Sequence, residues 1–298
     1  MSAASKSGGK PKLACEISAE RILAGRISDR RQTVTACARY ELAPGSVVPD
    51  LTENNLARRE AVRKAIQETL SSISERSRDV IAILPDAAVR VVLLDFEVLP
   101  TDLAEAESVV RFRLKKSLPF DVDKAKVSYH AQPSGTGIKV VAAVALSSVI
   151  EDYEAAFRDA GYSPGVVLPS TLAALGATDA RRPTLLVKVD TRTTSIAILE
   201  ENQMLLFRTL ENLRGVQITG EQLAEEVYPS VVFFQDTYHL NIEQIFVAGL
   251  PQSEGAAPAL RAQTGAEVRE LVRPSQLGQG SRDVPAWAMA GVVGALLS

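Results

Sequence analysis

The chain has 298 residues and a formal net charge of −3, with 46% hydrophobic and 23% charged residues. This length is too great for one ordinary core and indicates two lobes, while the weak net charge gives no reason to expect nucleic acid as a partner. Cys15 and Cys37 both lie in apolar runs, which predicts buried thiols in a reducing compartment rather than a disulfide framework. The two histidines lie far apart, and no cluster of cysteine and histidine has the spacing of zinc ligands, so we expect no metal site.

The two ends of the chain differ in character. Residues 1–11 are small, polar and basic and lack the apolar core of a signal peptide, so we expect a disordered leader. The last segment, WAMAGVVGALLS, is apolar but has only twelve residues, whereas a membrane-spanning helix needs about 20. It predicts a packed helix. A helix lying on a membrane surface stays open as an alternative, although the segment lacks the basic face that such helices use.

Residues 12–87 read as strands followed by a helix and a strand. Residues 12–42 predict three strands, because apolar and β-branched residues alternate with short polar turns. Residues 56–74 predict a helix, since four apolar residues at helical spacing share one face: Val62, Ile66, Leu70 and Ile73. DVIAILPD, which ends at Asp86, predicts a short buried strand.

Residues 88–165 form a compact strand, helix, strand, strand, helix pattern. The first strand ends at Pro100, and Thr101 is placed to cap a helix whose acids come early and whose bases come late. Two strands joined by the turn at 134–137 follow. Ser148 and Glu151 form the pattern of a capping box for the next helix, which closes at Gly161.

The remaining residues predict a second set of strands and helices. Pro164 and Pro169 indicate a crossover, and STLAALG a short helix. A hairpin over 185–200 and the strand LLFRTLE lead to a capping box at 219–222, opening a helix that Pro229 is expected to kink or split. A buried strand ends at Gly249, and a helix over 256–264, the strand EVREL and the terminal helix follow.

Several segments occur in a characteristic order along the chain, namely DVIAILPDAAVRVVLLDFEVLP, KKSLPFDVD, VAAVALSSVIEDYEAAFRDAGYSPGVVLPSTLAALGA, the hairpin at 185–200 and IFVAGLP. This order resembles the PilM family of type IV pilus assembly proteins and, more distantly, FtsA and the cytoplasmic domain of GspL. The resemblance implies a two-lobed, actin-like α/β fold, the duplicated ribonuclease H-like fold, with a small α+β subdomain inserted in the first lobe. It places the first lobe at 12–87 and 166–182, the insert at 88–165, and the second lobe at 183–298 with a shortened helical subdomain near 216–242.

The resemblance also implies a function. It predicts a non-enzymatic assembly or scaffold protein of a type IV pilus or related secretion machine, cytoplasmic and held at the inner membrane only through partners. Such a protein binds the cytoplasmic tail of a PilN-like membrane protein in a groove between the first lobe and the insert, and a homo-oligomer stays open. The residues expected to form part of this groove are Arg111, Phe112, Lys115, Pro119 and Phe120. The alternative is that Phe120 packs in a core and that the basic run is a solvated helix end.

A nucleotide site is the second feature that the resemblance raises. The family carries Asp-x-Gly and then Ser or Thr at each hairpin, whereas this chain has Glu16 and Ser18 at the first and Lys188 and Asp190 at the second. A Gly-Gly pair is expected near the base, but Leu250 follows Gly249. These departures predict a degenerate site without a cofactor, in which Lys188 pairs with Glu16 across the cleft.

Two other interpretations of these hairpins stay open. Lys188 extends out of its strand toward solvent, or it contacts phosphates directly. In the second case the chain is an ATP-binding switch or weak ATPase, and ATP with Mg would be held by Glu16, Ser18, Lys188, Asp190, Thr193, Thr194 and Gly249. A Thr-rich turn also often satisfies its own backbone.

Overall fold

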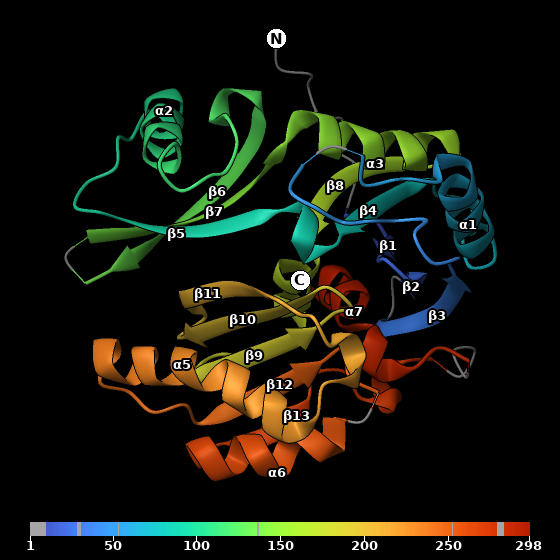
Figure 1. The fold of residues 1–298 in the computed structure, drawn as a ribbon. Helices are drawn as coiled ribbons and strands as arrows, with labels where there is room; N and C mark the ends of the chain where they lie inside the picture. Colours follow the sequence, from blue (N-terminus) through green and yellow to red (C-terminus); the bar gives the residue numbers. More distant parts are fainter. Residues whose placement is uncertain (1–9, 29–30, 53, 136, 252, 279–282) are drawn as a thin grey trace.

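The computed structural model describes residues 10–28, 31–52, 54–135, 137–251, 253–278 and 283–298, so that most of the predicted leader lies outside the described residues. The chain forms two lobes, each built on a five-stranded sheet, and a smaller three-stranded subdomain that extends from the first lobe (Figure 1). The two large sheets have the same plan. Three consecutive antiparallel strands form a meander, and two further strands that run parallel to the first strand of the meander complete the sheet.

The first sheet has the strand order β3-β2-β1-β4-β8. Every residue of its first strand is buried, because both faces of the sheet are covered by helices. α1 and α3 pack on one face, and α4 and the C-terminal helix α7 pack on the other. The bounds are β1 (Leu13–Ile17), β2 (Arg21–Ser28), β3 (Arg31–Glu41), β4 (Asp79–Leu84), β8 (Ser163–Pro169), α1 (Arg59–Ser71), α3 (Ser147–Asp159), α4 (Ser170–Ala174) and α7 (Ala290–Leu297).

Two expectations for the first lobe were wrong. The segment bounded by Pro164 and Pro169 is a strand, β8, and not a crossover loop, since a proline is tolerated at the edge of a sheet where one side of the backbone has no strand to bond. The predicted capping box of α3 is also absent. The helix begins at Ser147 behind Leu146, and no side chain caps it.

The inserted subdomain is a three-stranded antiparallel sheet with one helix on it. Its strand order is β5-β7-β6, and α2 packs on one face through Ala106, Val110 and Leu114. Asp102, and not Thr101, caps the helix by accepting hydrogen bonds from the backbone N–H groups of the first turn. The bounds are β5 (Arg90–Phe96), α2 (Leu103–Leu114), β6 (Ala125–Ser134) and β7 (Gly137–Leu146).

The second sheet repeats the plan of the first with the order β11-β10-β9-β12-β13. α5 begins at the predicted capping box and continues through Pro229 as one helix, so the expected split does not occur. α5 and α6 cover the face of this sheet that lies away from the first lobe (Figure 1). The bounds are β9 (Thr184–Val189), β10 (Thr193–Glu200), β11 (Gln203–Glu211), β12 (Gln244–Ala248), β13 (Glu267–Glu270), α5 (Gly220–Tyr238) and α6 (Ser253–Thr264).

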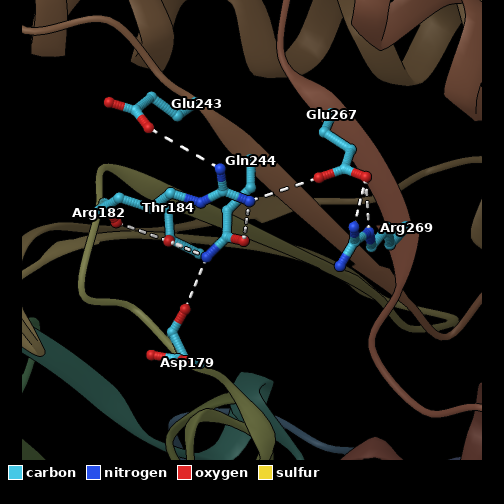
Figure 2. A network of polar contacts seen from close by, with 7 residues as sticks. All are labelled: Asp179, Arg182, Thr184, Glu243, Gln244, Glu267 and Arg269. Atoms are coloured by element: carbon cyan, nitrogen blue, oxygen red, sulfur yellow. Dashed lines mark hydrogen bonds and ion pairs between the residues drawn. The ribbon is translucent and has the colours of Figure 1, made fainter.

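A polar network fixes the chain where it passes from the first lobe to the second (Figure 2). The buried amide of Gln244 donates hydrogen bonds of 2.6 Å to the carbonyl of Asp179 and to Oγ1 of Thr184. Arg182 donates to Oε1 of the same amide at 3.0 Å and lies 3.4 Å from Glu267. The crossing segment is therefore held to β12 and to the edge strand β13.

The chain crosses between the lobes a second time near its end. α7 follows the second lobe in sequence, yet it packs against β1, β2 and α4 of the first lobe. One core cluster contains Ile81 of the first sheet, Leu186 of the second sheet and Val292 of α7. The two lobes therefore share a continuous apolar core.

Candidate functional site

A buried ion pair joins the two lobes. Nζ of Lys188, at the end of β9, lies 3.5 Å from Oε1 of Glu16, near the end of β1. Lys188 is 5% exposed and Glu16 is 4% exposed. The ion pair that the sequence suggested is therefore present, and Lys188 does not extend into solvent.

Hydroxyl groups and a second acid surround the pair. Ser170 donates to Oε1 of Glu16 in a short hydrogen bond. Asp86 accepts from the backbone N–H of Thr171 at 2.9 Å and from Oγ of Ser195 at 3.0 Å, so it also bridges the first lobe to β10 of the second. These hydrogen bonds compensate for burying a carboxylate between the lobes.

The cluster contains more carboxylates than ammonium groups, and this imbalance determines how the pKa of each group shifts. Burial by itself lowers the pKa of Lys188, but the carboxylates of Glu16, Asp86 and Asp190 together raise it above its ordinary value. Burial raises the pKa of Glu16, and the attraction of Lys188 offsets this only in part. Oε2 of Glu16 also has no hydrogen-bond partner. The lysine is therefore the firmly charged member of the pair.

The raised pKa of Lys188 predicts a loss of stability at high pH. Below its ordinary pKa the ammonium is present in both the folded and unfolded chains, so its stabilising contribution is complete. Above that value only the unfolded chain releases the proton, and the free energy of unfolding falls by up to about 1.4 kcal/mol per pH unit from this group. Urea titrations between neutral pH and pH ~11.5 should show a steeper fall for the natural chain than for Lys188→Met. Equal slopes would contradict the assignment.

The turns of both hairpins satisfy their own backbone groups. At the first hairpin, the N–H and the hydroxyl of Ser18 both donate to the carbonyl of Arg21. At the second, the carboxylate of Asp190 accepts from the N–H of Thr191, and the N–H of Asp190 donates to the carbonyl of Thr193. These groups, which the resemblance assigns to phosphates, are hydrogen-bonded within the chain.

The remaining predicted nucleotide residues are also held by protein atoms. Thr193 and Thr194 are both buried. Gly249 has a φ of +83°, and a Cβ atom there would lie 1.8 Å from the carbonyl oxygen of Val189, so a glycine is needed for close packing at the end of β9. The cavity lined by Glu16, Ser18, Lys188, Asp190 and Gly249 has a volume of about 40 Å³, whereas pockets for small organic ligands have about 300–1,000 Å³.

A larger apolar groove lies between the first lobe and the insert, with a volume of about 290 Å³. Ile150 of α3 and Val167 and Leu168 of β8 line its first-lobe wall, and Val127, Ala143 and Ala145 line its insert wall. β8 is an edge strand, and its residue Val166 is 40% exposed. Lys126 of β6 pairs with Glu154 of α3 at 3.6 Å, so a charged bridge crosses a groove whose lining is mostly apolar and also includes Ser128.

None of the five residues predicted for the partner groove lines this groove. Arg111 donates hydrogen bonds to the carbonyls of Val122 and Ala125, and Phe120 packs against the core of the insert. Both residues therefore hold the insert together, and their role in partner binding stays a prediction. Phe112, Lys115 and Pro119 are exposed on the opposite side of the insert sheet from Ala143.

Replacing Arg111 with alanine is expected to lower the free energy of unfolding by about 1–3 kcal/mol, because two buried carbonyls lose a charged donor. Lys115→Ala, one turn further along, is the matched control. Its ion pair with Asp123 is exposed and contributes less than about 1 kcal/mol. Thermal unfolding of both variants checks this, and equal stability of the two would contradict the structural role of Arg111.

The sequence reasoning missed three of the hydroxyl and carboxylate groups around the ion pair, which are those of Asp86, Ser170 and Thr171. One signal was available for Asp86. It is the last residue of the predicted buried strand, and β4 is parallel to β1, so its side chain comes to the same end of the sheet as Glu16 of β1. The other residues have no motif, because a hydroxyl beside a carboxylate has no fixed spacing in sequence.

The described residues contain neither a metal-binding cluster nor a membrane-spanning helix. No group of three or more His, Cys, Asp and Glu side chains in the described ranges is placed to hold a metal ion. Among the helices that the structure describes, none has the length and apolar character needed to cross a bilayer.

The fold is similar to several solved structures. The chain matches a structure of the PilM-PilN type IV pilus biogenesis complex with a TM-score of 0.79 and 20% sequence identity, over 96% of this chain and 98% of that one. It matches a Bacteroides thetaiotaomicron protein of actin-like ATPase fold and unknown function, with a TM-score of 0.56 and 10% identity over 94% of both chains. It also matches the cytoplasmic domain of EpsL, an inner-membrane component of the Vibrio cholerae type II secretion system. That match has a TM-score of 0.51 and 12% identity over 80% of this chain and 83% of that one.

These similarities define the fold class. No protein-family model matches the sequence, and no curated protein matches it. The structural matches confirm the predicted two-lobed, actin-like fold. They also confirm the resemblance to PilM at the level of the fold.

Proposed function

We propose that this chain is an assembly protein of a type IV pilus or related secretion machine, which binds an extended tail of an inner-membrane partner. The observation that carries the proposal is the apolar groove between the insert and the first lobe. It occurs in a fold whose solved neighbours include a PilM-PilN complex and the cytoplasmic domain of a secretion component. The partner class is a PilN-like protein, and the chain lies in the cytoplasm at the inner membrane through that partner.

The chemistry of the groove suits an extended peptide. Apolar walls accept bulky aliphatic side chains of the tail, and the free edge of β8 offers backbone groups for strand addition. Burial of one or two such anchors in a desolvated pocket supplies most of the binding energy of an interface of this kind. The tail therefore binds through apolar anchors and main-chain hydrogen bonds.

We further propose that the protein acts without nucleotide turnover. Lys188 holds the position of an acid at the second hairpin and neutralises Glu16, and the cavity between the hairpins is small. The ion pair links the lobes in the way that a bound nucleotide and its metal would. In this proposal the lobes keep one arrangement, and recognition of the tail is the working event.

A second candidate function is an ATP-binding switch. A cavity of about 500 Å³ lies where α5 and α6 begin, lined by residues that include Thr219, Gly220, Leu250 and Gly255. Val216 lines both this cavity and the small one beside Lys188. The observation favours a site for the base and sugar of a nucleotide whose phosphates lie toward the hairpins.

Calorimetric titration separates the two functions. The protein is titrated with Mg-ATP and, separately, with a synthetic peptide of the cytoplasmic N-terminal tail of a PilN-like protein. Micromolar binding of the peptide without heat from ATP supports a nucleotide-independent adaptor. Tight ATP binding that is lost in Lys188→Met would favour the switch, and failure of the peptide to bind would remove the adaptor function.

A further inference from the structure

The end of α2 carries an exposed aromatic ring among basic side chains. Phe112 is 69% exposed, although Val110 and Leu114 of the same helix pack on the insert sheet. Lys115 and Lys116 follow at helical spacing, so they share its face of the helix. Arg113 is exposed beside it, and Lys124 is exposed after the turn that follows α2. We call these five residues, Phe112, Arg113, Lys115, Lys116 and Lys124, the α2 basic surface.

The segment that carries the α2 basic surface is positively charged, whereas the chain as a whole is negatively charged. Residues 111–126 contain six basic and two acidic residues, whereas the whole chain has a formal net charge of −3. Three of the bases have partners within the chain, since Arg111 pairs with Glu107, Lys126 pairs with Glu154, and the guanidinium of Arg113 lies 5.4 Å from the ring centre of Phe96. Within the described residues, Lys116 and Lys124 have no acidic partner, and Lys115 reaches Asp123 only in an exposed pair of 3.4 Å.

The position of α2 leaves this surface open. α2 covers the face of the insert sheet that lies away from the second lobe (Figure 1). Val140, Ala142 and Val144 of β7 point toward the helix, while Ala143 and Ala145 point to the opposite face and line the apolar groove. The α2 basic surface and the groove are therefore on opposite faces of one thin sheet, and each can be occupied without blocking the other.

We infer that the α2 basic surface docks onto an anionic lipid bilayer. Lysine and arginine side chains near a membrane are attracted by anionic headgroups, and an exposed aromatic ring gains by entering the interfacial region. The α2 basic surface has both the basic side chains and the aromatic ring, within the last turn of α2 and the segment that follows it. An acidic protein surface would attract the lysines, but it would leave the ring of Phe112 without the apolar layer that a bilayer provides.

The α2 basic surface by itself binds a bilayer only weakly, and such reversible binding suits a protein that is recruited to the membrane by a partner. A few basic residues and one ring give reversible binding, and a second membrane signal is needed for stable attachment. A partner tail in the groove would hold the protein near the bilayer and raise the effective concentration of the α2 basic surface there. The lipid contact itself rests on the exposed residues and does not require the groove to be occupied.

Vesicle co-sedimentation of the full chain tests the inference. One set of vesicles contains phosphatidylcholine only, and a second also contains phosphatidylglycerol. We expect binding only to the anionic vesicles, with a decrease when salt is raised. Lys115→Gln/Lys116→Gln should reduce the bound fraction on the order of tenfold, and Phe112→Ala should reduce it by a smaller factor. None of these side chains is buried, so thermal unfolding should show that the variants remain folded.

A matched variant on the first lobe makes the test specific. Arg58 and Arg76 are exposed, and Arg58→Gln/Arg76→Gln removes the same charge from another face. Retained vesicle binding in this control supports the α2 basic surface. An equal loss in the control would overturn the inference, as would no binding to anionic vesicles. Lysine-dependent binding to polyglutamate without binding to lipid would identify an acidic macromolecule instead, and would also overturn it.

Discussion

Replacing Lys188 with methionine is expected to lower the free energy of unfolding by about 3–5 kcal/mol. The substitution keeps most of the side-chain volume but leaves the carboxylate of Glu16 buried without its cation. Asp86 and Asp190 lie near enough to raise the pKa of Glu16 further, so the hydrogen bond from Ser170 is left as the main stabilisation of the charged form. Urea unfolding at neutral pH, followed by circular dichroism, measures the change.

Two further variants show whether the loss comes from an unpaired buried charge. Glu16→Gln/Lys188→Met removes both charges and should recover a large part of the lost stability, because the cost of the single variant lies in the isolated carboxylate. Arg59→Met breaks an exposed ion pair of 2.7 Å with Asp152 and should cost less than about 1 kcal/mol. A double variant no more stable than Lys188→Met would show that the carboxylate is not the source of the loss.

Enlarging Ala143 to methionine is expected to weaken binding of the partner tail by about 30-fold, which corresponds to about 2 kcal/mol. Ala143 lies in the insert wall of the groove and points away from the core of the insert, so the longer side chain enters the space proposed for an anchor residue. The stability of the protein should change little, because the groove has room for the added atoms. Calorimetric titration with the tail peptide measures the affinity.

The control for this prediction is Ala131→Met, which adds the same side chain to β6 at an exposed position outside the groove. We expect unchanged affinity in this variant. If Ala143→Met also binds the peptide with unchanged affinity, the tail does not occupy the groove, and the proposed function loses its main support.

Local patterns in the sequence predicted most of the secondary structure. The three strands at residues 12–42, α1, the capping box at Thr219 and the C-terminal helix all depend on short-range alternation or on capping residues a few positions apart. β8 was missed because its prolines suggest a break, whereas the edge position that tolerates them is a property of the assembled sheet. The prediction that Pro229 kinks or splits its helix was wrong for a similar reason, because packing of α5 on the second sheet keeps the helix continuous.

The candidate site was predictable to a smaller extent. The pairing of Glu16 with Lys188 followed from their equivalent places in two duplicated hairpins, which the fold brings face to face. The groove could not be predicted in the same way, because its walls come from β6, β7, β8 and α3, and no local pattern records their meeting. Arg111 and Phe120 were predicted to contact a partner because basic and aromatic residues suit a binding surface, and in the structure both also hold the insert together.

The return of α7 to the first lobe has a consequence for the order of folding. Residues of α7 pack on β1 and β2, which are synthesised before the insert and the second lobe, so these contacts join positions far apart in sequence. The first sheet therefore has an uncovered apolar face throughout synthesis of the insert and the second lobe. Closing such a long loop is slow, and exposed apolar faces favour aggregation. The first lobe thus completes its core only after the insert and the second lobe have been synthesised, so chaperone dependence is expected to be greatest for the first lobe.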